Sequence, residues 1–543
     1  MVSTTWRRMW KWHYQIKDLF MKFAPHTPDT VLQQDEDKLD LSQDHEPPHM
    51  TPLRWTGLIL GPILFLLILL FLKPEGLSPE GVAVLASTVW IAIWWVTEAI
   101  PIPATSLLPI ILFPLTNAVT TSVVTGAYAD NNIYLFMGGF MLALALEKWN
   151  LHKRIALTII SVVGTSPNAL IGGFMIATAF LSMWVSNTAT AMMMLPIATA
   201  VIFKMNESLK ETKDPRIAEN FSKALLLGVG YAASIGGLAT LIGTPPNLIF
   251  ATYAKEIFGV EISFAKWMLF GLPLSLVILI FCWFYLTKIA FRVNVKNIPG
   301  GLEVIREEKK ALGKAGLEEK IVLTIFVATA LLWVLRSFIF GEGKLFELAL
   351  DDTIIAILAA IVLFIIPARD GKALLGWEDA VKLPWGILLL FGGGLAIAKG
   401  FTETGLATWL GTQLEVLKGA PMILVVLAVT TLVIFLTEFT SNTATATMMF
   451  PIMGALAVAI DVHPYTLCIA AGLAASCAFM FPVATPPNAV VFSSGYIKMM
   501  DMAKAGLWLN IVCIFIITGF LYFLLGSIWG IDIGSYPVDF PKP

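Results

Sequence analysis

One five-residue string, SNTAT, occurs twice in this chain, at residues 186–190 and 441–445, each time inside a long apolar stretch. Polar side chains are costly to bury in hydrocarbon, so a repeated polar string in such a setting indicates function. A second string, TPPN, follows each copy, at 244–247 and at 485–488. The two pairs predict a membrane protein built from two copies of one structural unit.

The composition supports this interpretation. Of all residues, 57% are hydrophobic and 14% are charged, whereas a soluble domain carries about 25% charged residues. The apolar runs reach about 20 residues, the length of helix that crosses about 30 Å of hydrocarbon. We therefore predict an all-α polytopic membrane protein that uses the lipid bilayer as its solvent. A net charge of −2 indicates no nucleic-acid partner, and the four cysteines lack the CxxC spacing of a zinc or disulfide framework.

The apolar runs form two series with the same plan. In the first half we expect spans at 55–72, 82–99, 101–116 and 132–147, and then an amphipathic piece at 149–163. A re-entrant hairpin follows at 168–203, a broken helix at 224–258 and a last span at 266–290. After a charged linker, the second half repeats this plan, with spans at 321–340, 352–367 and 384–402 and an amphipathic piece at 404–418. A second hairpin follows at 421–460, a broken helix at 465–497 and a last span at 504–530. SNT lies at the tip of each hairpin and TPP in each broken helix. The total is about 11 transmembrane crossings, two re-entrant hairpins and two broken helices.

The orientation follows from the basic residues. The N-terminal arm, residues 1–54, begins with a basic and aromatic stretch that predicts a helix in the cytoplasmic headgroup region, and continues with an acidic, proline-rich stretch that predicts disorder. With this arm in the cytoplasm, most of the 36 lysines and arginines fall on cytoplasmic loops, and the tail at 531–543 is extracellular. Five crossings, an odd number, separate the hairpins. The hairpins therefore enter from opposite sides and the repeats are inverted.

Each SNT string is expected to begin a half-helix at a hairpin tip, because Ser and Asn favour helix N-caps. Such a terminus carries free N–H groups and about half a positive charge, so it attracts anions without lysine or arginine. Two tips from opposite sides could hold the two carboxylates of one molecule. A co-bound cation would relieve the excess negative charge. The breaks at Gly243-Thr244 and Ala484-Thr485 free backbone carbonyls that, with Ser and Asn oxygens, suit Na⁺.

Other interpretations of these polar residues are possible. Small polar residues also serve tight helix packing in membranes, but packing alone does not explain two identical strings that are each followed by TPPN. Glu438, three residues before Ser441, could be a proton or cation relay; we favour a capping or packing role. His152 and His463 fall at the ends of elements, where a surface role is favoured over a switch.

The chain resembles the divalent anion/sodium symporter family, most closely the bacterial sodium–dicarboxylate symporters. The resemblance rests on WVTEAIPIPATSLLP (95–109), the paired SNTAT strings, GTPPN (243–247) and ATPPN (484–488), and it covers about residues 55–530. It implies a homodimer in the plasma membrane that works as an elevator. The implied division is a scaffold at 55–163 and 321–418, transport parts at 164–291 and 419–530, and a cytoplasmic linker at 292–320.

The same resemblance implies the site residues. One Na⁺ site would use Ser182, Ser186, Asn187 and Gly243, and the other Thr437, Ser441, Asn442 and Ala484. The substrate carboxylates would meet Asn187, Thr188, Asn442 and Thr443, with Thr244, Thr485 and Pro486 nearby.

The expected function is Na⁺-coupled symport of C4-dicarboxylates such as succinate, malate and fumarate, with two or more Na⁺ ions carried. The alternative is a dicarboxylate exchanger of the same fold without Na⁺ coupling, since the same oxygens could be present with no bound cation. An enzyme is not expected, because the sequence has no HExxH, no GxSxG and no cluster rich in His and Asp.

Overall fold

The computed structural model describes residues 51–164, 166–208, 215–293, 301–340, 350–369 and 371–541, and every named element within them is a helix. This confirms the all-α prediction. The interfacial helix and the disordered stretch expected in the N-terminal arm lie outside the described residues.

The helices of the first half follow the predicted series closely. They are α2 (Pro52–Phe71), α3 (Pro79–Thr97), α4 (Ile102–Thr105), α5 (Leu108–Leu115), α6 (Thr121–Ala127), α7 (Asn131–Lys148), α8 (Leu151–Val163), α9 (Pro167–Ser182), α10 (Asn187–Ser208), α11 (Pro215–Gly237), α12 (Pro245–Phe258) and α13 (Phe264–Phe284), which continues as the π-helical η1 (Tyr285–Ala290).

The second half has the same order of elements. It contains α14 (Gly301–Ala311), α15 (Leu317–Ile339), α16 (Asp352–Ile365), α17 (Trp377–Ala380), α18 (Trp385–Glu403), α19 (Leu406–Leu414), η2 (Glu415–Leu417), α20 (Met422–Thr437), α21 (Asn442–Ala459), α22 (Pro464–Ala475), α23 (Pro486–Phe492), α24 (Met499–Phe520), η3 (Leu521–Leu525) and α25 (Gly526–Trp529).

The number of long helices is smaller than the number of predicted crossings. Among the described residues, eight helices are long and apolar enough to cross a membrane, or nine if the pair Leu406–Leu417 and Met422–Thr437, bent by 117°, forms one span. The predicted span at 101–116 is instead α4 followed by α5. Pro103 and Pro109 each lie at the start of one of these helices, a position that proline favours, so the apolar run divides into two short helices.

Each SNT string lies at the turn between two helices. The first string joins α9 to α10, and the second joins α20 to α21. The broken helices are α11 with α12, interrupted over residues 238–244, and α22 with α23, interrupted over residues 476–485. Both interruptions begin earlier than TPP alone predicts, because side chains bond the backbone of these segments and take it out of the helix, as described below.

Elements of the two halves pack into each other. α23 of the second half contacts α10 and α11 of the first, while α12 of the first half contacts α21 and α22 of the second. The ring centroids of Phe250 and Tyr465 are 5.5 Å apart, and those of Phe250 and Phe450 are 6.2 Å apart. The hairpins and broken helices of both halves therefore share one core.

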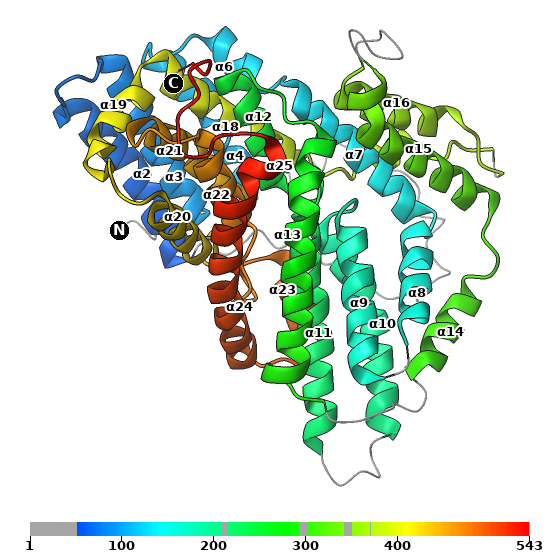
Figure 1. Cartoon of the computed structure of the whole chain (residues 1–543). Coiled ribbons are helices and arrows are strands. Elements are labelled where there is room, and N and C mark those ends of the chain that lie inside the picture. The colour runs from blue at the N-terminus through cyan, green and yellow to red at the C-terminus, as the bar shows by residue number, and fades with distance from the viewer. Residues whose placement is uncertain are drawn as a thin grey trace, which may run out of the picture. The chain divides into compact units, whose positions relative to one another are not determined.

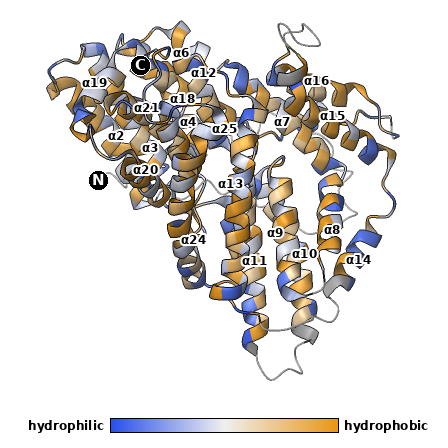
Figure 2. Cartoon of the chain, in the orientation of Figure 1, coloured by the Kyte–Doolittle hydropathy of each residue, from blue (hydrophilic) through white to orange (hydrophobic). Residues whose placement is uncertain are grey.

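The long helices of this core are visible in two views. Figure 1 shows α9, α10 and α11 side by side, with α13 and α24 next to them. Figure 2 shows mainly apolar residues along α9, α13 and α24, and hydrophilic residues gathered at the end of α11 where that helix begins. This distribution is typical of helices that lie in a bilayer and end at its surface.

Candidate functional site

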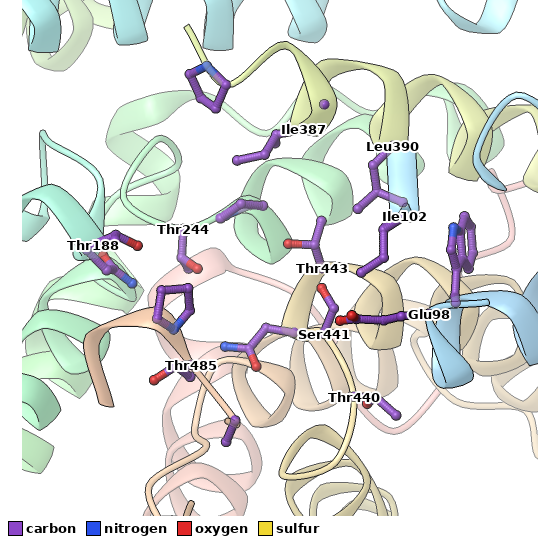
Figure 3. A pocket seen from close by; sticks show the side chains of 18 of the residues that line it. Glu98, Ile102, Thr188, Thr244, Ile387, Leu390, Thr440, Ser441, Thr443 and Thr485 are labelled. Atoms are coloured by element: carbon purple, nitrogen blue, oxygen red, sulfur yellow. The ribbon is translucent and has the colours of Figure 1, made fainter. Parts of the chain in front are cut away.

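Both hairpin tips and both helix breaks line one cavity of about 680 Å³. Thr188, Thr244, Ser441, Thr443 and Thr485 surround it in Figure 3. Eleven of the predicted site residues line this cavity: Ser186, Asn187, Thr188, Gly243, Thr244, Ser441, Asn442, Thr443, Ala484, Thr485 and Pro486. The other two, Ser182 and Thr437, are buried and are hydrogen-bonded to the two asparagines.

Oxygen atoms converge at the first tip. The hydroxyl of Ser182 bonds the side-chain oxygen of Asn187 and lies 2.6 Å from the carbonyl oxygen of Ala233. The amide oxygen of Asn187 also lies 3.2 Å from the carbonyl oxygens of Ala233 and Gly243. Turned over, this amide would donate to both carbonyls. Turning the amide over therefore satisfies these groups without a cation, whereas the orientation that presents four oxygens, with a single hydroxyl proton among them, is favoured only when a hard monovalent cation is bound.

The second tip repeats this arrangement. The hydroxyl of Thr437 lies 2.7 Å from the side-chain oxygen of Asn442 and 2.8 Å from the carbonyl oxygen of Ala475, and its one proton is shared between them. A hydroxyl, an asparagine amide and a backbone carbonyl from the neighbouring broken helix therefore meet at both tips. Ala484, which the sequence pairs with Gly243, lines the cavity.

The two serines of the SNT strings differ in their bonds. Ser186 accepts a hydrogen bond from the N–H of Ala189 at 3.2 Å, as an N-cap does. Ser441 makes no such bond, although it directly precedes α21. Both SNT strings therefore begin a helix, as predicted, but the side-chain cap bond is present at Ser186 and missing at Ser441.

Glycine is required at two points beside the first tip. A Cβ atom on Gly243 would lie 2.5 Å from the carbonyl oxygen of Gly237. A Cβ atom on Gly237 would lie 2.9 Å from both the amide oxygen of Asn187 and the carbonyl oxygen of Gly243. These distances are too short for carbon, so only glycine lets the two backbone segments close around the asparagine.

The asparagine of each TPPN string holds the break together, a role that the sequence analysis did not assign. The amide of Asn247 donates to the carbonyl oxygens of Gly237 at 3.0 Å and Thr240 at 2.7 Å. The amide of Asn488 donates to the carbonyl oxygens of Ala478 and Phe481, both at 3.1 Å. In each repeat the bonded carbonyls lie ten and seven residues before the asparagine. The matched position of Asn in the two TPPN strings was the available signal.

Glu438 is fully buried and makes the contacts of a capping residue. Its carboxylate accepts hydrogen bonds from the N–H groups of Phe479 at 2.8 Å and Met480 at 3.0 Å. The amide of Asn510 on α24 donates to it at 2.6 Å. The favoured interpretation of Glu438 is in line with this geometry. No local sequence pattern indicated that Asn510 would be its partner.

The predicted surface role of the two histidines is wrong. His152 is 8% exposed and His463 is 3% exposed. Nδ1 of His152 lies 3.0 Å from the carbonyl oxygen of Leu146, and Nδ1 of His463 accepts a hydrogen bond from the N–H of Tyr465 at 3.2 Å. The ring of His152 on α8 lies against the end of α7, and the ring of His463 lies against the start of its own helix, α22.

The charged side chains among the described residues that line the cavity are Arg54 and Glu98, and they form an ion pair at 3.1 Å. An anionic ligand at the tips would therefore meet neutral donors rather than an unpaired cation. The beginnings of α10 and α21, with their free N–H groups, supply the favourable electrostatic field.

Comparison with known proteins gives consistent matches. The model of a family described as the sodium:sulfate symporter transmembrane region matches residues 53–535. A sodium-dependent dicarboxylate transporter, SdcS, of Staphylococcus saprophyticus is 50% identical over 480 residues, which are 88% of this chain and 92% of that protein. SdcS of Staphylococcus aureus is 51% identical over 482 residues, with the same coverage.

A solved structure also matches in fold. MtrF of Neisseria gonorrhoeae, described as illuminating a class of antimetabolite efflux pumps, has a TM-score of 0.57 and covers 91% of this chain and 98% of its own. At 14% sequence identity this likeness concerns the fold alone.

Proposed function

This chain belongs to the sodium:sulfate symporter family, a family of multi-pass membrane transporters, and from that premise we propose that it imports C4-dicarboxylates together with Na⁺. Succinate, malate and fumarate are the proposed substrates. The names of the SdcS relatives support the substrate class and the coupling ion. The observation that carries the proposal is the single cavity in which the two SNT tips meet without an unpaired cation.

The proposed substrate site uses both tips. One carboxylate meets Asn187 and Thr188 at the start of α10, and the other meets Asn442 and Thr443 at the start of α21. A further set of cavity residues lies beside them: Thr244, Thr485 and Pro486. Amide and hydroxyl donors, added to the N-terminal ends of two helices, favour a dianion whose charges are separated by a short carbon chain.

The proposed cation sites lie beside the asparagines of the two tips. One Na⁺ binds among the oxygens around Asn187, and a second binds among those around Asn442. Two monovalent cations balance the charge of one dianion, so the loaded protein carries no net charge from its ligands through the low-dielectric interior. Na⁺ binding and dicarboxylate binding therefore favour each other.

We further propose an elevator mechanism in a homodimer in the plasma membrane, with the N-terminus in the cytoplasm and the C-terminus outside. The moving part comprises 164–291 and 419–530, and the scaffold comprises 55–163 and 321–418. The packing of hairpins and broken helices from both halves around one core supports their movement as a unit.

Reconstituted liposomes test the function. One set has an inward Na⁺ gradient and no internal substrate, and the other has K⁺ on both sides with unlabelled succinate inside. Uptake of labelled succinate in the first set alone is the expected result. Uptake in the second set that is indifferent to Na⁺ would instead identify an exchanger, and the cation sites would be withdrawn while the anion site stood.

A further inference from the structure

Glu438 holds an unusual position for an acid in this chain. The side chain is 0% exposed, and it directly follows Thr437 at the end of α20. Its Oε1 accepts from Phe479, Met480 and Asn510, and its Oε2 accepts from Met480 at 3.1 Å. Both oxygens therefore act as acceptors, which is the bonding pattern of a carboxylate. All these donors are neutral, so they stabilise the negative charge without cancelling it.

The carboxylate also controls the chain break of the second repeat. Phe479 and Met480 lie in the segment 476–485, which joins the end of α22 at Ala475 to the start of α23 at Pro486. The carbonyl of Ala475 bonds Thr437, and Ala484 lines the cavity. Glu438 thus holds a segment that begins beside the Ala475 carbonyl at the second tip and reaches the cavity at Ala484.

The first repeat has no acid at this place. The residue three positions before its SNT string is Met183, whose carbonyl oxygen accepts from the hydroxyl of Thr240 at 2.6 Å. The ring N–H of Trp267 on α13 donates to the carbonyl oxygen of Leu238 at 3.0 Å. The first break is therefore fixed by neutral groups alone, and the negative charge beside the second break is a real difference between the repeats.

From this asymmetry we infer that Glu438 is the positioning residue and the fixed counter-charge of the cation site at the second tip. The inference rests on the proposed Na⁺ coupling. A buried carboxylate without a counter-ion is costly, and a cation bound at the neighbouring oxygens offsets that cost. The second tip therefore binds its cation with the help of a full negative charge, whereas the first tip relies on oxygen dipoles.

Thermal unfolding of the purified protein in detergent tests this inference without any transport. The melting temperature is measured over a series of NaCl concentrations, with choline chloride keeping the ionic strength constant. A ligand that binds the folded state stabilises it by RT ln(1 + [L]/Kd), so the Na⁺ concentration needed for a given rise in melting temperature scales with the dissociation constant. Wild type and Glu438→Gln are compared with Asn510→Ala, which removes one donor from the same carboxylate but leaves its charge.

In Glu438→Gln, the Na⁺ concentration needed for a given rise in melting temperature is expected to increase about tenfold, as for loss of one nearby charge in a partly screened site. Asn510→Ala is expected to melt lower in choline and in Na⁺ alike, with the wild-type Na⁺ dependence. If Glu438→Gln melts lower but keeps that dependence, the carboxylate is merely a cap and the inference is overturned.

Two further outcomes are separable. A wild type with no response to Na⁺ would contradict the proposed coupling itself. Should Glu438→Gln fail to fold, Asn510→Lys neutralises the same carboxylate from α24, and it should increase the Na⁺ concentration needed for a given rise in melting temperature about as much. An unchanged Na⁺ response in Asn510→Lys would then overturn the inference.

Discussion

At the first tip, Ser182 joins the amide of Asn187 to the carbonyl of Ala233; at the second, Thr437 joins the amide of Asn442 to the carbonyl of Ala475. A hydroxyl, an amide and a backbone carbonyl come together at both tips, and the carbonyl of Gly243 joins them at the first. The groups that support them differ. Two glycines let the backbone close tightly around the first asparagine, whereas a buried acid holds the chain beside the second.

The two repeats therefore share an arrangement of oxygen atoms but differ in the packing that supports it. The first break, 238–244, is shorter than the second, 476–485. A longer interruption leaves more backbone N–H groups without helical partners, and Glu438 accepts two of them. Substitutions of the residues that supply the paired oxygens are therefore expected to have similar effects at the two tips. Substitutions of the residues that hold these oxygens in place are expected to have different effects.

The largest effects are expected at the ligands themselves. Asn187→Ala and Asn442→Ala should each lower Na⁺-driven succinate uptake by about 100-fold or more, because each removes an amide shared by a cation and a carboxylate. Initial rates in proteoliposomes are the measurement. Asn220→Ala, on an asparagine outside the cavity, is the control and should transport normally. Normal uptake by either tip variant would remove that tip from the site.

The next effect should separate the two tips. Gly243→Ala places a Cβ atom against the carbonyl of Gly237, so uptake should fall about 30-fold, while the reverse change Ala484→Gly should stay within about threefold. An equal loss of uptake in both variants would show that the close approach of the two backbone segments at the first tip is not required for transport.

Stability should respond to the two clamping asparagines. Asn247→Ala and Asn488→Ala should each lower the free energy of unfolding by about 1–3 kcal/mol, because buried carbonyls lose their donor. Asn247 should cost more, since it also bonds Leu238 and so serves three carbonyls, against two for Asn488. Denaturation in detergent measures both, and the opposite ranking would refute the clamping role as described.

The smallest effect is expected from exchanging the hydroxyls. Ser182→Thr and Thr437→Ser each keep the donor to the asparagine and the carbonyl, so uptake should stay within about threefold of wild type. The matched alanine variants lose the hydroxyl and should fall by about tenfold. Alanine variants with normal uptake would show that the hydroxyls are not cation ligands.

Much of this arrangement could be predicted from the sequence. The SNT strings marked the two turns, and TPP marked the breaks, because proline and small polar residues act locally on the backbone. The cavity collects these motifs from both halves, as expected for an internal duplication. The position of the two tips could therefore be predicted from the local sequence motifs and from their repetition.

Long-range partners could not be predicted in the same way. The contact of Glu438 with Asn510 on α24 depends on how two distant helices pack, and no local pattern specifies it. The prolines divide the run 101–116 into α4 and α5, and the prediction of one span gave more weight to the apolar length of the run than to these prolines. The burial of His152 and His463 likewise follows from tertiary packing rather than from position in an element.

The central claim is that both tips form one site in which Na⁺ and a dicarboxylate bind together. Succinate binding to the purified protein, measured by calorimetry at about 1 mM and about 100 mM Na⁺ at constant ionic strength, tests it most directly. Because linked ligands strengthen each other, the dissociation constant should fall at least about tenfold at the higher Na⁺ concentration. The Na⁺ dependence should be absent in Asn187→Ala and in Asn442→Ala. An equal dissociation constant at both concentrations in the wild type would contradict the account.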